Sequence, residues 1–289
     1  MRILIYGSGV IGSLYGALLS EAGFDVTLYA RGKRLEVLRR SGLRYRTKDG
    51  VKQASVNVID TLAPTDRYGF VFLTVKENQL YTALKELKEN SSPTIVTMVN
   101  SLDSYDRWEA LCGEGRILPA FPGAGGGFDG EILNAALTPR LIQPTTIGQI
   151  DGRANQLAAL LRKARIPCAI VEDMHAWQIC HLAMVVPIAD AYNEADDPKN
   201  AGKDSALMRK TARNISDNLK AVALRGVPIT PKKLKLFLVL PEGLVSVALG
   251  VTYRSRFGEV FMYRHSVKAP DEMRRLHEQL YSWLEDSKT

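Results

Sequence analysis

Three glycines near the start of the chain, Gly7, Gly9 and Gly12, constrain its fold more than any other feature. They follow an apolar run at residues 2–6 and precede residues 13–22, whose apolar side chains recur at helical spacing. In such a strand, turn and helix, the glycines allow a tight turn, close approach of a pyrophosphate, and close packing of the helix on the strand. The residues expected to bind the pyrophosphate at the helix N-terminus are Gly7, Ser8, Gly9, Val10, Ile11 and Gly12. The alternative is a glycine-rich turn without a ligand.

Strand-like and helical segments alternate through the first part of the chain. The strand-like segments are residues 2–6, 24–30, 70–75, 94–99, 116–121, 141–149 and 166–171. This alternation predicts a doubly wound parallel sheet of the Rossmann type. From residue 173 onward the spacing is helical. The sequence therefore predicts an α/β protein with two domains: a dinucleotide-binding Rossmann domain at residues 1–171 and an all-helical C-terminal domain for the substrate at residues 172–289.

The residue after the second predicted strand favours NADP(H) over NAD(H). NAD-binding domains usually have an acidic residue there, about 20 residues beyond the glycines, that holds the ribose 2′-hydroxyl. This chain has Arg31 instead, followed by Lys33 and Arg34, and a guanidinium with neighbouring cations suits a 2′-phosphate. The alternative is a solvated basic helix face. We expect such a face for four later arginines, Arg39, Arg40, Arg44 and Arg46.

Ligands of open parallel sheets bind beyond the carboxyl ends of the strands. Lys76 follows the strand at 70–75, Asn100 follows the strand at 94–99, and the glycine-rich stretch 123–127 follows the strand at 116–121. We expect all three to lie along one edge with the glycine turn and to form the rim of an active site. The alternatives are a helix-capping or surface lysine, a turn-forming asparagine and a flexible connection.

Composition narrows the classes of function. The chain has 38 basic and 31 acidic residues, a formal charge of +7, and its basic residues are scattered without interleaved aromatic residues, so we expect no nucleic-acid partner. Its three cysteines share no metal-ligand spacing, which favours a reduced compartment and predicts no metal site. The sequence shows neither a signal segment nor a membrane span of roughly 18 apolar residues, so we expect a soluble, cytoplasmic protein that binds no membrane.

The helical half offers fewer chemical groups. Trp177, His181 and Met184 share one predicted helix face, and Glu259 lies on a later helix. A face with a single histidine is more often structural than catalytic. A basic cluster could bind an anionic substrate, although a solvated face is the interpretation we prefer. This cluster consists of Arg254, Arg256, Arg264, His265 and Lys268.

With these residues in view, most of the chain resembles the ketopantoate reductase family (2-dehydropantoate 2-reductases). The matching segments are GSGVIGSLYGALLSEAG, YARGKRLEVLRRSGL, VKENQ, MVNSL, TTIGQIDG and NLKAVALRGVPI. The resemblance implies an NADP-binding Rossmann domain joined to a helical domain. It also implies that Arg31 contacts the 2′-phosphate, that Lys76 and Gln79 lie beside the cofactor, and that Asn100 lies near both the nicotinamide and the substrate.

One helix departs from the family pattern, which has a lysine shortly after a tryptophan and then two asparagines at intervals of four before a proline. Alignment on Trp177 or on Pro187 supplies neither the lysine nor the asparagines. Since an imidazole titrates near neutrality, His181 on this helix is our candidate general acid. The resemblance makes Glu259 the candidate for the family's substrate-contacting glutamate, and Asn100 completes the candidate catalytic residues.

These features together predict an NADPH-dependent reductase of a small 2-oxo acid, which is anionic, or of a related carbonyl compound. The alternative is an NADP(H)-binding sensor or partner-binding protein that has lost the chemistry. The sequence leaves a homodimer open as the assembly.

Overall fold

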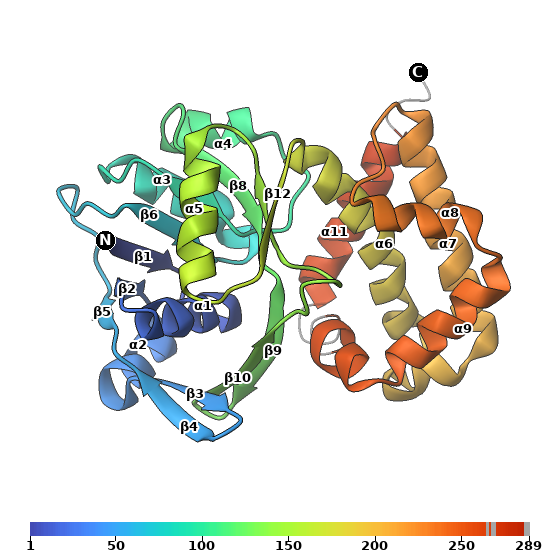
Figure 1. Ribbon diagram of the computed structural model, residues 1–289, viewed down its shortest axis with the longest axis horizontal. Coiled ribbons are helices and arrows are strands. Elements are labelled where there is room, and N and C mark those ends of the chain that lie inside the picture. Colours follow the sequence, from blue (N-terminus) through green and yellow to red (C-terminus); the bar gives the residue numbers. More distant parts are fainter. Residues whose placement is uncertain (264–265, 267–269, 286–289) are drawn as a thin grey trace. The chain divides into compact units, whose positions relative to one another are not determined.

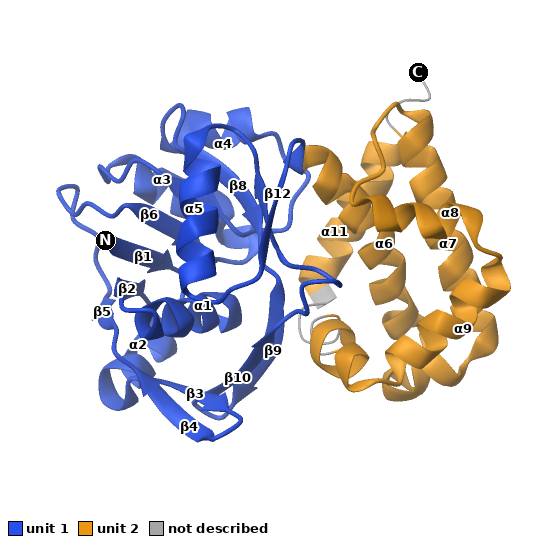
Figure 2. Ribbon diagram, in the orientation of Figure 1, with its two compact units in different colours: residues 1–174 blue, residues 175–289 orange. Residues whose placement is uncertain are grey.

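The computed structural model describes residues 1–263, 266 and 270–285 (Figure 1). Figure 2 divides the chain into two compact units, residues 1–174 and residues 175–289. The first unit contains the strands and the second is helical, so the predicted fold class, an α/β Rossmann-type sheet followed by an all-helical region, is confirmed. In the described part of the chain, no helix is long and apolar enough to cross a membrane.

Eight of the described strands form the main sheet, in the order β12-β11-β8-β7-β6-β1-β2-β5. Their bounds are β1 (Arg2–Tyr6), β2 (Asp25–Tyr29), β5 (Asn57–Ile59), β6 (Phe70–Leu73), β7 (Ile95–Thr97), β8 (Ile117–Phe121), β11 (Thr145–Gly148) and β12 (Cys168–Val171). The neighbours from β5 to β8 pair in parallel. The pair β8 and β11 is antiparallel, so the predicted all-parallel sheet becomes mixed at this end.

Both faces of the main sheet are buried, as in other parallel sheets, and successive apolar residues of a strand point to opposite faces. In β1, Ile3 and Ile5 belong to one core cluster and Leu4 and Tyr6 to the other. The first face is covered by α1 (Val10–Glu21), α2 (Gly32–Ser41) and α5 (Gly152–Lys163). The opposite face is covered by α3 (Leu80–Lys88) and α4 (Tyr105–Cys112), with the buried Trp108 in its core.

A second sheet, which the sequence analysis did not predict, packs against α1. Its order is β4-β3-β10-β9, and its strands are β3 (Leu43–Thr47), β4 (Gly50–Ala54), β9 (Ala124–Asp129) and β10 (Ile132–Leu137). One expectation was therefore wrong, because Arg44 and Arg46 lie on a strand and not on a helix face. The alternative of a flexible connection at 123–127 is also wrong, because most of this stretch is strand β9. Gly126 is needed there because a Cβ at this position would lie 2.4 Å from the Cα of Ala135 on β10.

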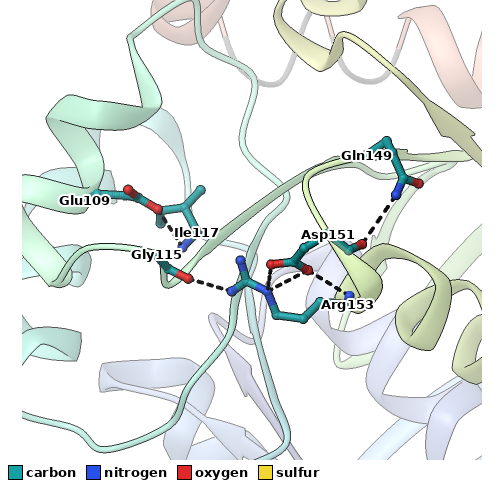
Figure 3. A network of polar contacts seen from close by, with 6 residues as sticks. All are labelled: Glu109, Gly115, Ile117, Gln149, Asp151 and Arg153. Atoms are coloured by element: carbon teal, nitrogen blue, oxygen red, sulfur yellow. Dashed lines mark hydrogen bonds and ion pairs between the residues drawn. The ribbon is translucent and has the colours of Figure 1, made fainter.

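A polar network fixes α5 to the start of β8 (Figure 3). The Asp151 side chain caps α5 by accepting from the backbone N–H of Arg153 at 2.8 Å, and the Arg153 guanidinium donates back to Asp151 and to the Gly115 carbonyl at 2.7 Å. These hydrogen bonds from Arg153 lower the pKa of the Asp151 carboxyl. Because Gly115 precedes β8, this network lies at the amino end of that strand and has a structural role.

The second unit consists of helices that pack mainly on one another. Its described elements are α6 (Met174–Glu194), η2 (Pro198–Lys203), α7 (Ser205–Leu224), η3 (Lys232–Lys235), α8 (Leu236–Val239), α9 (Glu242–Tyr253), the π-helical η4 (Gly258–Tyr263) and α11 (Pro270–Glu285). The predicted break at Pro241 separates α8 from α9. Buried residues of α7 such as Leu219 and Val222 form its core with residues of α9 and α11.

Candidate functional site

The register of the parallel strands brings four predicted site residues to one edge of the main sheet. Tyr6, the last residue of β1, pairs with Tyr29 of β2 and with Leu73 of β6, and Leu73 pairs with Thr97 of β7. The strands therefore end level with one another. The residues that follow these ends are Gly7, Arg31, Lys76 and Asn100. This edge is where open parallel sheets bind their ligands.

Each glycine of the motif has a different steric environment, which explains the absence of a side chain at that position. Gly7 has a φ of +112°, which disfavours any residue with a Cβ. A Cβ on Gly12 would lie 2.0 Å from the Gly7 carbonyl oxygen and 2.5 Å from Thr74 Oγ1. A Cβ on Gly9 would meet no described atom within 4 Å, so space remains over the backbone where α1 begins. With no acidic residue in its first turn, this helix end suits a pyrophosphate.

Side chains around the turn hold its backbone in place. Thr74 Oγ1 donates to the Gly7 carbonyl at 2.6 Å, and Ser13 Oγ donates to the Ser8 carbonyl at 3.0 Å. Arg34 donates from Nε to the same Ser8 carbonyl at 3.1 Å and from Nη2 to Ser13 Oγ at 3.1 Å. Its guanidinium lies over the Phe128 ring, 4.4 Å from the ring centre. The turn is therefore held by side chains from α1, from α2 and from Thr74, the residue that follows β6.

Replacing Arg34 with methionine should loosen this turn. Methionine keeps an apolar stem beside Phe128 but donates no hydrogen bond to Ser8 or Ser13. We expect the free energy of unfolding to fall by about 1–2 kcal/mol. We also expect the affinities for NADPH and NADH to fall, each by the same factor as the other, because both cofactors contain the pyrophosphate. Urea denaturation and calorimetric titration would measure both effects. Arg39→Met, on the exposed side of the same helix, is the control, and a loss confined to NADPH would contradict this role.

Arg31 lies two residues beyond the end of β2 and caps the start of α2 with extended backbone. Its guanidinium donates to Tyr29 Oη at 2.9 Å and to Glu86 Oε2 of α3 at 2.6 Å. The hydrogen bond from Arg31 to Glu86 raises the pKa of the guanidinium. The Arg31 side chain remains 57% exposed, so it stays accessible to a ligand.

Lys76 precedes η1 (Glu77–Gln79), the short helix after β6, and Gln79 is its last residue; both are exposed. Asn100, three residues beyond the last paired residue of β7, is half-buried. Its Oδ1 atom is buried and accepts no hydrogen bond from any residue in the described parts of the chain. Leaving such an acceptor unpaired costs about 1–3 kcal/mol, so Oδ1 suits a hydroxyl or amide donor from a ligand.

The remaining candidates belong to the second unit. His181 is buried on α6 and stacks on Trp177, with 4.9 Å between ring centres, which confirms that the two share a helix face. Glu259 lies exposed on η4. Of the predicted basic cluster, Arg254 and Arg256 are exposed, whereas Arg264, His265 and Lys268 lie outside the described residues.

Thr74, Arg34 and Glu86 have roles in this region that the sequence analysis missed or misread. Arg34 appeared as a neighbour of the 2′-phosphate, but its guanidinium turns toward the glycine turn. Thr74 falls inside a run that reads as strand, and Glu86 is 55 positions from Arg31. For Thr74 and Arg34, adjacency to predicted site residues was the only available signal. No comparable signal marked Glu86.

Comparison with known proteins agrees with this geometry. Residues 3–149 match the family model described as ketopantoate reductase PanE/ApbA. A 2-dehydropantoate 2-reductase of Archaeoglobus fulgidus is 32% identical over 179 residues, which cover 60% of this chain and 57% of that relative. The match thus spans little more than half of the relative's length.

Two solved structures share the fold over nearly the whole chain. A putative ketopantoate reductase from Ralstonia solanacearum MolK2 has a TM-score of 0.67 and 15% identity, covering 97% of this chain and 98% of that chain. D-mandelate dehydrogenase, solved with NADH and anilino(oxo)acetate, has a TM-score of 0.62 and 14% identity, with 99% of each chain covered. Because the family model covers more than half of the sequence, the chain belongs to the ketopantoate reductase PanE/ApbA family.

Proposed function

We propose that this protein is an NADP(H)-dependent reductase of a small 2-oxo acid or a related carbonyl compound. The observation that carries the proposal is the sheet edge where the glycine turn, Arg31 and the unpaired acceptor of Asn100 follow strands that end level. The names of the similar proteins, 2-dehydropantoate 2-reductase and D-mandelate dehydrogenase, support a substrate with a carbonyl or hydroxyl group on the carbon next to a carboxylate.

The residues present fit a nicotinamide dinucleotide. The backbone N–H groups at the start of α1 would hold the pyrophosphate, in the space over Gly9. Arg31 would bind the ribose 2′-phosphate through charge-assisted hydrogen bonds. Lys76 and Gln79 would lie beside the cofactor. Asn100 Oδ1 would accept a hydrogen bond from the cofactor or the substrate and so orient the reacting carbonyl.

When bound, the nicotinamide supplies the hydride that reduces the carbonyl carbon. The protein must then deliver a proton to the carbonyl oxygen and hold the substrate in place. We assign the proton to the imidazolium of His181, which becomes neutral imidazole as the substrate oxygen becomes a hydroxyl. Stacking on Trp177 fixes the plane of the imidazole. Glu259 would accept a hydrogen bond from the substrate.

Replacing His181 with glutamine should lower kcat by about 100-fold or more, because a positioned general acid contributes roughly 10²–10⁴-fold. Glutamine cannot release a proton near neutral pH, so it cannot replace the acid. NADPH affinity should remain unchanged. His175→Gln, on the same helix, is the matched control. Full turnover by His181→Gln would remove His181 from the mechanism.

NADPH oxidation, followed by absorbance against ketopantoate and a panel of 2-oxo acids, tests the proposal as a whole. We expect turnover on at least one of these acids, with NADPH preferred over NADH. Tight NADPH binding without turnover on any member of the panel would contradict the reductase and support an NADP(H)-binding sensor.

A further inference from the structure

The Arg31 guanidinium forms a cluster with three other side chains, those of Tyr6, Tyr29 and Glu86. Tyr6 and Tyr29 end adjacent strands, and Glu86 reaches them from α3. Glu86 Oε2 accepts hydrogen bonds from Arg31 Nη2 at 2.6 Å, from Tyr29 Oη at 3.4 Å, and from Tyr6 Oη. Arg31 also donates to Tyr29 Oη, from Nε at 2.9 Å and from Nη2. One carboxylate oxygen thus gathers three donors.

This arrangement occupies the part of Arg31 that phosphate recognition would use. A guanidinium binds a phosphate or carboxylate best through two parallel N–H groups, and here Nε and Nη2 both donate within the protein. The Tyr6 and Tyr29 rings are buried and stack with 4.4 Å between their centres, so the acceptor groups are held in place. The carboxylate also cancels the single positive charge of Arg31.

The ionisation of Glu86 agrees with this arrangement. Partial burial acts to raise the pKa of its carboxyl group, but hydrogen bonds from Arg31 and Tyr6 outweigh burial and hold the pKa below its usual value. Glu86 therefore stays negatively charged at neutral pH, where the 2′-phosphate carries a charge of about −2 by analogy with other phosphate monoesters. The Glu86 carboxylate and the 2′-phosphate would therefore compete for the Arg31 guanidinium.

We propose that Glu86 is a specificity-determining residue that competes with the 2′-phosphate for Arg31 and so limits the preference for NADPH over NADH. The inference rests on the proposed function, in which Arg31 binds that phosphate. NADPH must displace Glu86 from Nη2 and Tyr29 Oη from Nε to reach this edge of Arg31, or bind its less favourable remaining side. NADH has no 2′-phosphate and meets no such competition.

Glu86→Gln is the direct test, because glutamine keeps a carbonyl oxygen for Tyr6 and Arg31 but removes the charge. We expect the Kd of NADPH to fall by about twofold to fivefold, the upper part of the range for losing a partly exposed ion pair, while the Kd of NADH changes less than about twofold. Glu89→Gln removes the same charge from an exposed position at the end of the same helix and should change neither Kd. Fluorescence titration of both cofactors gives the four constants.

Glu86→Gln in an Arg31→Ala background tests competition by Glu86 separately from binding of the 2′-phosphate by Arg31. If competition acts through Arg31, Glu86→Gln should then change the NADPH Kd by less than about twofold. An unchanged or weaker NADPH affinity in Glu86→Gln alone would overturn the inference, and weaker affinity would show that Glu86 orients Arg31 productively. If Arg31→Ala alone leaves the ratio of the two affinities unchanged, phosphate recognition by Arg31 fails instead.

Discussion

Replacing Arg31 with alanine is expected to weaken NADPH binding by about 100-fold and to change NADH binding by less than about threefold. Two charge-assisted hydrogen bonds to the 2′-phosphate, each worth roughly 1.5–3 kcal/mol, would be lost, and a 100-fold change corresponds to about 2.7 kcal/mol. NADH lacks the phosphate and so lacks these bonds. Calorimetric titration with each cofactor gives the ratio directly.

The control for Arg31 is Arg39→Ala. Arg39 carries the same charge and lies on α2, the helix that Arg31 caps, but it pairs with Asp60 at 3.1 Å and takes no part in the candidate site. We expect both cofactors to bind this variant as they bind the unaltered protein. If Arg31→Ala weakened NADPH and NADH equally, Arg31 would act on a group that both cofactors share, and the assignment of the 2′-phosphate would be wrong.

The second large effect is expected from Gly12→Ala. The added Cβ would lie 2.0 Å from the Gly7 carbonyl oxygen, and this backbone atom cannot move without opening the turn. We expect the free energy of unfolding to fall by about 3 kcal/mol, at the upper end for overpacking, and cofactor affinity to fall by more than about 100-fold. Thermal denaturation and cofactor titration would measure the two losses.

Two other glycines separate the causes of these losses. Gly9→Ala adds a Cβ with no described atom within 4 Å, so it should leave stability within about 0.5 kcal/mol but weaken both cofactors by obstructing the pyrophosphate. Gly152, at the start of α5, is equally open but lies away from the glycine turn, and Gly152→Ala should change neither quantity. Full cofactor affinity in Gly9→Ala would mean that the pyrophosphate binds elsewhere.

The parts of the fold that the sequence predicted are those with local signals. The strand, turn and helix around Gly7 are contiguous, and the apolar runs of β6, β7 and β8 are short and uninterrupted. The second sheet escaped prediction because β4 is mostly exposed and β9 is rich in glycine, so neither carries a clear apolar alternation. Its pairing also joins residues far apart, such as Tyr45 and Leu133.

The candidate site also has a part that the sequence predicts, the position of its residues, and a part that it does not, the direction of their side chains. The strand-end rule brings Arg31, Lys76 and Asn100 to one edge because backbone register alone decides where strands end. The direction of a side chain depends on tertiary contacts. Arg31 and Arg34 are three residues apart in one basic segment, yet one meets Glu86 and the other braces the glycine turn. No spacing rule distinguishes them.

Transfer of a labelled hydrogen tests most directly the claim that this protein is an NADPH-dependent reductase. NADPH carrying deuterium at one of the two hydrogens on the nicotinamide C4 would be incubated with the protein and the best 2-oxo acid of the panel, and the product analysed by mass spectrometry. Our account predicts one deuterium on C2 of the 2-hydroxy acid from one labelled form and none from the other, because a bound nicotinamide presents a single face. A protein that binds NADPH tightly but transfers no deuterium from either form would contradict it.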